Sequence, residues 1–366
     1  MIETKNNQRI WQVSFLKGIA IIMVVLVHSA QPFKVHGLEF MQMGCQVFFV
    51  LSGFTLALSY DKHYTDYKSF LLHRYIRLVP GYIMTIFLGL IVSGISILLF
   101  KKNITGIDTN LVDVIINLIM IHGLFPTQAN NHVVRGGWFV GTMVLLYMIF
   151  PLFMKLLPKK KNSTSIWVIV LFFFIVLINC VVTLLLKLNL NFFIENNSYA
   201  YFSIFNQLPC FLLGIVLYHL WQRDDYNGVI MLLMIILGVG ISIILFYTNT
   251  IFSFVLLPSV FGAFVINVFL LLKKCQKNTS KNVIIKLISE IGDISFPIYL
   301  IHSFIVYDAM YFVKKAILYI NRGGDMKLLY HILLPFVLMS VVWAGYFYNC
   351  MIKKVSSMMP NNKKRI

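Results

Sequence analysis

The chain has 366 residues, of which 59% are hydrophobic and 12% charged, and its mean hydropathy is +0.82. Soluble globular proteins carry roughly 25% charged residues, so this composition excludes a soluble enzyme, a disordered chain and a fibrous repeat. The net charge of +18 is expected from basic cytoplasmic loops beside anionic lipids, and we predict no nucleic-acid partner. The chain is predicted to be a membrane protein with multiple spans.

Apolar runs of spanning length follow one another along the chain and predict about ten membrane helices. They lie at residues 14–32, 40–60, 80–100, 138–157, 166–187, 199–220, 229–247, 251–272, 290–313 and 328–350. A further run at 111–125 contains Asp113, Asn117 and His122. Its length is more typical of a re-entrant or interfacial segment than of a span.

Loop charge favours the arrangement in which 111–125 does not cross the membrane. With ten spans and a cytoplasmic N-terminus, most lysines and arginines lie inside, whereas an eleventh crossing would place most of them outside. We predict an all-α polytopic bundle with both termini cytoplasmic. We expect residues 1–366 to form one membrane domain with a short basic tail at 353–366 and no fused soluble domain. The five cysteines have no disulfide or metal-ligand spacing, and we expect no metal site.

The first span carries two ionisable residues, Lys17 and His28. Eleven residues at 3.6 per turn place both on one helix face, about 16 Å apart along the axis. Polar groups inside spans are costly and are often functional. One interpretation is a cation that holds an anionic group while the histidine works deeper in the membrane. The other is a snorkelling lysine with a histidine at the outer end of the span.

Two arginines, Arg74 and Arg77, lie on one helical face just before the third span. Paired arginines suit bidentate recognition of phosphate, although basic residues also flank membrane spans for topological reasons. Pro80 is expected in the first turn of the third helix.

A polar stripe precedes the end of the chain. Ser295, Tyr299 and His302 follow one another at offsets of four and seven, which places them on one face of a helix. They form either a catalytic face with His28 or an interhelical hydrogen-bonding stripe. By contrast, Gly44, Gly53 and neighbouring serines in residues 44–60 predict close helix packing and a structural role.

Taken in order, these segments resemble the acyltransferase-3 family of integral membrane acyltransferases. The resemblance rests on five patterns in the family's order: Lys17 with His28; "FFVLSGF" at 48–54; Arg74, Arg77 and Pro80; "WFVGTMVLLYMIFP" at 138–151, with Trp138, Tyr147 and Pro151 in register; and "GDISFPIYLIH" at 292–302.

The resemblance implies transfer of an acyl group, usually acetyl, from cytoplasmic acetyl-CoA to a hydroxyl of a cell-surface glycan such as O-antigen or exopolysaccharide. It also implies a multi-pass protein of the bacterial inner membrane. We assign catalysis to His28, His302, Tyr299 and Ser295, and coenzyme binding to Lys17, Arg74 and Arg77. Trp138 and Arg135 are predicted to bind the acceptor sugar, because aromatic faces and polar side chains suit sugars. The sequence does not define the oligomeric state.

One departure from the family concerns position 143, five residues after Trp138, where the family usually has glutamate and this chain has Met143. Glu39, Asp113 and Asp308 are the nearest acidic candidates by span position. A different class of function is also open: a transporter or flippase for lipid-linked glycans without acyl chemistry. A third possibility, suggested by Met143, is a relative that has lost activity.

Overall fold

The computed structural model describes residues 10–63, 66–125, 128–156, 161–190, 199–222, 227–248, 250–275, 282–320 and 325–358, and these residues form helices and loops without β-strands. In chain order the elements are α1 (Trp11–Ala30), η1 (Gln31–Phe33), η2 (Glu39–Met43), α2 (Gly44–His63), α3 (Tyr67–Phe100), α4 (Leu111–Leu118), η3 (His122–Leu124), α5 (Trp138–Leu156), α6 (Lys161–Leu190), α7 (Tyr199–Phe202), α8 (Ile204–Trp221), α9 (Gly228–Thr248), α10 (Ile251–Lys274), α12 (Val283–Asp293), α13 (Ser295–Ser303), η4 (Phe304–Ala309), α14 (Met310–Ile320) and α15 (Met326–Met358).

The predicted polytopic helical bundle is confirmed. Within the described residues, nine helical segments are long and apolar enough to cross a membrane. The predicted span at 166–187 falls in α6, whose described apolar stretch, Val170–Leu185, is shorter than those nine. Helix α4 has eight residues and rises only about 12 Å, so it is too short to cross a bilayer.

Side-chain caps explain where several helices begin. The Asp66 carboxylate accepts from the Ser69 backbone N–H at the start of α3, which satisfies one of the orphan donors of the first turn. Because α3 begins there, Pro80 lies inside the helix. Our prediction that Pro80 starts the third helix was therefore wrong. The helix continues through the polar segment before the span, and Arg74 and Arg77 belong to it.

Close helix crossings occur where glycines meet. A Cβ atom on Gly53 of α2 would overlap the carbonyl oxygen of Phe211, and one on Gly214 of α8 would overlap that of Val50. The predicted packing role of the glycines in 44–60 is confirmed, since small residues let the two backbones approach.

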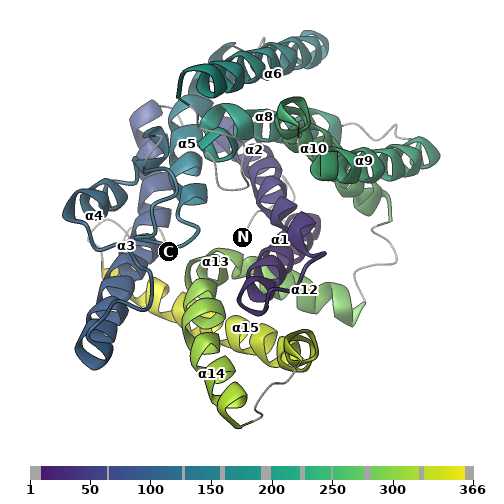
Figure 1. The fold of residues 1–366 in the computed structure, drawn as a ribbon. Helices are drawn as coiled ribbons and strands as arrows, with labels where there is room; N and C mark the ends of the chain where they lie inside the picture. Colours follow the sequence, from purple (N-terminus) through teal and green to yellow (C-terminus); the bar gives the residue numbers. More distant parts are fainter. Residues whose placement is uncertain are drawn as a thin grey trace.

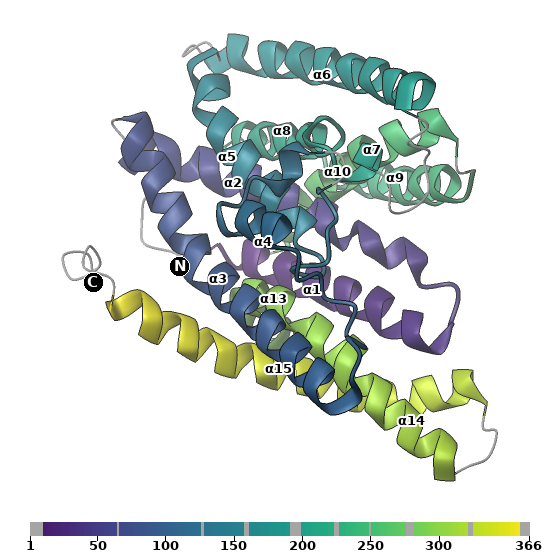
Figure 2. The same ribbon diagram turned by 60° about the vertical axis from the view of Figure 1, so that its left-hand side comes forward.

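Burial separates inner helices from peripheral ones (Figure 1). In the apolar windows of α2 and α1, 78% and 61% of residues are buried, compared with 17% in α9 and 22% in α15. The exposed side chains of α9 include Val229, Ile236 and Ile244, which suits contact with lipid. Helices α1 and α3 begin, and α2 and α15 end, on the same side of the bundle, at the left of Figure 2.

Candidate active site

The two membrane histidines predicted to act together are neighbours in the structure. His28 lies in the last turn of α1 and His302 lies near the end of α13. Their ring centroids are 5.3 Å apart. His28 is half-buried and His302 is 2% exposed. Two imidazoles at the bundle interior form the centre of the candidate site.

His28 is bonded to a residue that the sequence analysis did not single out. Its Nδ1 lies 2.7 Å from the hydroxyl oxygen of Tyr307. The Tyr307 hydroxyl in turn donates to Oε1 of Gln31. Gln31 follows His28 by three residues, at the start of the short helix η1. One chain of hydrogen bonds thus joins His28 at the end of α1, Tyr307 of the segment after α13, and Gln31 at the start of η1.

A π-helix explains why Tyr307 faces His28. In a continuous α-helix, Tyr307 would lie about 80° around the axis from Tyr299. Residues Phe304–Ala309 instead form the π-helix η4, where the wider turn reduces the rotation per residue. Such bulges occur often at functional sites. The α-helical stripe that contains Tyr299 and His302 therefore does not extend to Tyr307. The adjacent polar residues Tyr307 and Asp308 inside an apolar span were nevertheless a signal in the sequence that could have identified this position.

The predicted stripe on α13 faces the interior. Ser295, Tyr299 and His302 are 6%, 4% and 2% exposed. The Tyr299 hydroxyl donates to the carbonyl of Gly136 at 2.6 Å, and its backbone carbonyl lies 2.6 Å from Nδ1 of His302. Because a carbonyl only accepts, Nδ1 of His302 carries a hydrogen. Ser295, the first residue of α13, precedes His302 by about 10 Å along the helix axis. It lies on the side of the site that faces the start of α1.

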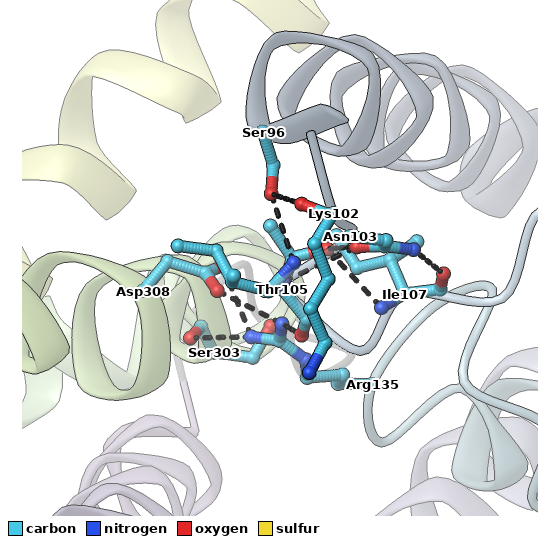
Figure 3. Close-up of polar contacts among 9 residues, drawn as sticks. Ser96, Lys102, Asn103, Thr105, Ile107, Arg135, Ser303 and Asp308 are labelled. Atoms are coloured by element: carbon cyan, nitrogen blue, oxygen red, sulfur yellow. Dashed lines mark hydrogen bonds and ion pairs between the residues drawn. The ribbon is translucent and has the colours of Figure 1, made fainter. Parts of the chain in front are cut away.

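Arg135 is held by protein groups on several sides (Figure 3). Its guanidinium forms a bidentate ion pair with Asp308 at 2.9 and 3.0 Å. It also donates to the backbone carbonyls of Thr105 and, at 3.4 Å, Ser303. The guanidinium carbon lies 5.4 Å from the ring centroid of Tyr307. Arg135 thereby joins the loop after α3 to the π-helix beside His28.

That loop is ordered by its own polar contacts. The Ser96 hydroxyl donates to the Lys102 carbonyl and accepts from the Ile104 N–H. The Asn103 side chain donates to the carbonyl of Ile107 at 2.9 Å. These bonds fix the Thr105 carbonyl that Arg135 contacts (Figure 3).

Trp138 begins α5 inside an aromatic cluster. It is 8% exposed, and its ring centroid lies 4.9 Å from that of Phe202 and 5.5 Å from that of Tyr201. The indole packs among aromatic rings, and sugar binding by Trp138 and Arg135 stays a prediction.

The predicted coenzyme-binding residues converge at the other end of α1. The charges that act on the Lys17 ammonium are those of Arg77, Asp293 and Arg74. Nη2 of Arg74 donates to the hydroxyl of Ser59, a residue of α2, at 2.7 Å. Ser59 therefore helps to hold Arg74 beside Lys17 and Arg77. Eleven residues separate Lys17 from His28, a rise of about 16 Å.

Met143 is 3% exposed and belongs to the hydrophobic core. Of the three acidic candidates, Glu39 begins η2 and bonds to His36 and to the Gly37 N–H. The pKa of Asp113 on α4 is raised, mainly by its hydrogen bond with Asp108 and then by burial. Asp308 is the candidate that lies beside Tyr307 and Arg135, although its carboxylate is already paired.

Comparison with known proteins gives one family. A family model described as an acyltransferase domain matches residues 10–350, nearly the whole chain. No curated protein and no solved structure matches the chain.

Proposed function

The chain belongs to the acyltransferase-3 family of membrane acyltransferases, and from this premise we propose that it transfers an acetyl group from acetyl-CoA to a hydroxyl of a cell-surface glycan. The observation that carries the proposal is the family match over residues 10–350. The multi-pass helical bundle provides the membrane setting that such a reaction needs. The proposed location is the bacterial inner membrane, with both termini cytoplasmic.

The donor enters at the Lys17 end of the bundle in this proposal. Arg74 and Arg77 hold the phosphates of acetyl-CoA through charge-assisted hydrogen bonds. Lys17 adds a third positive charge close to them. The thin pantetheine arm then reaches along α1 towards His28, which lies about 16 Å away along the axis.

His28 acts as general base. It takes the proton of the acceptor hydroxyl as that oxygen attacks the thioester carbonyl carbon. The C–S bond breaks, the acyl group becomes an ester of the glycan, and the leaving thiolate of the coenzyme takes the proton from protonated His28, which restores the neutral imidazole. A half-buried neutral imidazole suits this role near neutral pH.

The α13 side chains complete the proposed site. The His302 ring centroid lies 5.3 Å from that of His28, and we assign His302 to bind the acceptor hydroxyl, from which its Nε2 can accept a hydrogen bond. Tyr299 holds the backbone at Gly136 and orients His302 through its carbonyl. Ser295 extends the polar face towards the donor. Trp138 and Arg135 are assigned to the acceptor side.

The experiment follows thioester consumption by the full chain, purified in liposomes. It receives acetyl-CoA and a lipid-linked glycan extract from its own host, and free thiol is measured beside a His28→Ala control. Thiol release that requires both His28 and the extract supports the proposal, and mass spectrometry of the extract then identifies the acyl group and its acceptor.

Two outcomes would overturn the proposal. A transporter or flippase leaves acetyl-CoA intact while glycan moves across the bilayer. A relative without activity neither releases thiol nor moves glycan, and Met143 would then be the first residue to revert.

A further inference from the structure

The hydrogen bonds at the end of α1 have a defined direction. A tyrosine hydroxyl has one proton to donate. Tyr307 donates that proton to Oε1 of Gln31, and an amide oxygen only accepts. The contact of 2.7 Å between the Tyr307 oxygen and His28 Nδ1 must then be donated by the imidazole. Nδ1 of His28 carries the hydrogen.

We propose that Tyr307 and Gln31 are positioning residues that hold neutral His28 with its hydrogen on Nδ1, leaving the lone pair on Nε2 to accept the proton of the substrate hydroxyl. A neutral imidazole has one donor and one acceptor nitrogen, and the partner of one nitrogen decides the state of the other. The kinetic consequence rests on the proposed function, whereas the tautomer is a property of the protein itself.

The surroundings of Tyr307 keep its hydroxyl in place. Its ring meets the ring of His28 edge-on at 5.9 Å, and the Arg135 guanidinium covers it at 5.4 Å. The next residue, Asp308, is fixed by the bidentate pair with Arg135. The π-helix places both residues on the site, and Arg135 anchors them to the loop at Thr105. The tyrosine is thus positioned before any substrate binds.

His302 shows the same arrangement with a simpler partner. Its Nδ1 donates to the Tyr299 carbonyl at 2.6 Å, which leaves Nε2 as its acceptor. The two neighbouring imidazoles therefore each use Nδ1 to bind the protein and keep Nε2 for other partners. For His28 this choice depends on two side chains, so substitution can reverse it.

The first test is spectroscopic. Full-length protein with ¹⁵N-labelled histidine is studied in liposomes by solid-state NMR, and the His28 signals are assigned by their loss in His28→Ala. We expect a protonated Nδ1 and an unprotonated Nε2 in the unmodified chain. In Tyr307→Phe the Nδ1–H loses its acceptor and the tautomers mix. In Gln31→Leu the Tyr307 proton is released to donate to Nδ1, which shifts the hydrogen to Nε2.

The second test is kinetic and uses conservative variants. Gln31→Leu should lower kcat about 100-fold, since a wrongly placed imidazole proton removes most of a general base's contribution, while KM for acetyl-CoA stays within about twofold because the donor site lies about 16 Å away. Tyr307→Phe, in which the tautomers mix, should lower kcat less, by about tenfold. Gln31→Glu keeps an acceptor for Tyr307 and should retain activity within about threefold.

Tyr330→Phe is the matched control. The Tyr330 hydroxyl lies 3.3 Å from that of Ser29, the residue after His28, so its loss also removes a buried contact to α1. It should change neither the His28 tautomer nor kcat. An unprotonated Nδ1 in the unmodified chain would overturn the inference, as would a Tyr307→Phe protein with normal tautomer and kcat. A chain without thiol release but with the expected tautomer would contradict the proposed function alone.

Discussion

The two ends of helix α1 use charge in opposite ways. Around Lys17, the charges of two arginines and one aspartate act on the ammonium, so positive charge is in excess among these groups. Around His28, within the described part of the chain, the Arg135 guanidinium is paired with the Asp308 carboxylate, and the imidazole contacts Tyr307, Gln31 and His302. An excess of cations suits an anionic ligand, whereas neutral groups suit proton transfer.

This difference implies a division of labour along a single helix. Binding energy from phosphates is available only where cations are held in excess. A base works best where nearby charges cancel, because an uncompensated cation would oppose protonation of the imidazole.

Removal of the base tests the His28 end most directly. His28→Ala should lower the rate of acyl transfer by about 10²–10⁴-fold, the usual contribution of a general base. Thiol release from acetyl-CoA in liposomes measures the effect, with gel filtration to show that the protein still folds. His331→Ala is the control, since this exposed histidine contacts the Lys327 carbonyl and the Tyr330 ring and takes no part in the proposed site. Product formed by His28→Ala at the normal rate would refute the assignment.

Charge cancellation at the same end can be broken by removing one partner of the ion pair. Arg135→Ala or Asp308→Ala alone leaves a poorly exposed charge, because the two side chains are 13% and 15% exposed. Each should lower the free energy of unfolding by about 3 kcal/mol. The double variant should cost less than the sum of the two. Thermal unfolding in detergent, followed by intrinsic fluorescence, measures these effects, and strictly additive losses would contradict the coupling.

The cationic end was predictable from sequence because it follows regular helical spacing. Arg74 and Arg77 at i, i+3, and Lys17 and His28 at i, i+11, need only an α-helix of 3.6 residues per turn. The same holds for the stripe that contains Tyr299 and His302. The apolar runs likewise predicted the membrane helices, since span length is set by the bilayer.

The polar surroundings of His28 were not predictable in this way. Tyr307 reaches His28 through a π-helix, and helical periodicity contains no information about an extra residue in one turn. Asp308 was noted, but its pairing with Arg135 joins segments far apart in the chain. Pro80 was misplaced for a local reason: the Asp66 cap starts α3 well before the apolar run.

Neutralising the cations tests the Lys17 end. Arg74→Ala combined with Arg77→Ala should raise the apparent KM for acetyl-CoA about 100-fold or more, since each charge-assisted hydrogen bond contributes about 1.5–3 kcal/mol, and should leave kcat nearly unchanged. The salt dependence of KM should weaken as well. Lys101→Ala with Lys102→Ala removes the same charge from exposed positions at the far end of α3, and serves as the control. An unchanged KM in the arginine variant would remove both residues from the donor site.

The smallest change is expected from restoring the family's carboxylate. Met143→Glu places an acid at a position that is 3% exposed within the apolar core, where desolvation favours the protonated, neutral form. Because Tyr307 already contacts Nδ1 of His28, we expect no gain in acyl transfer and a modest loss of thermal stability. Met143→Leu separates the effect of losing the methionine from that of adding the acid. A large gain in thiol release by Met143→Glu alone would show that the His28 end is impaired without that carboxylate, and that the tyrosine does not replace it.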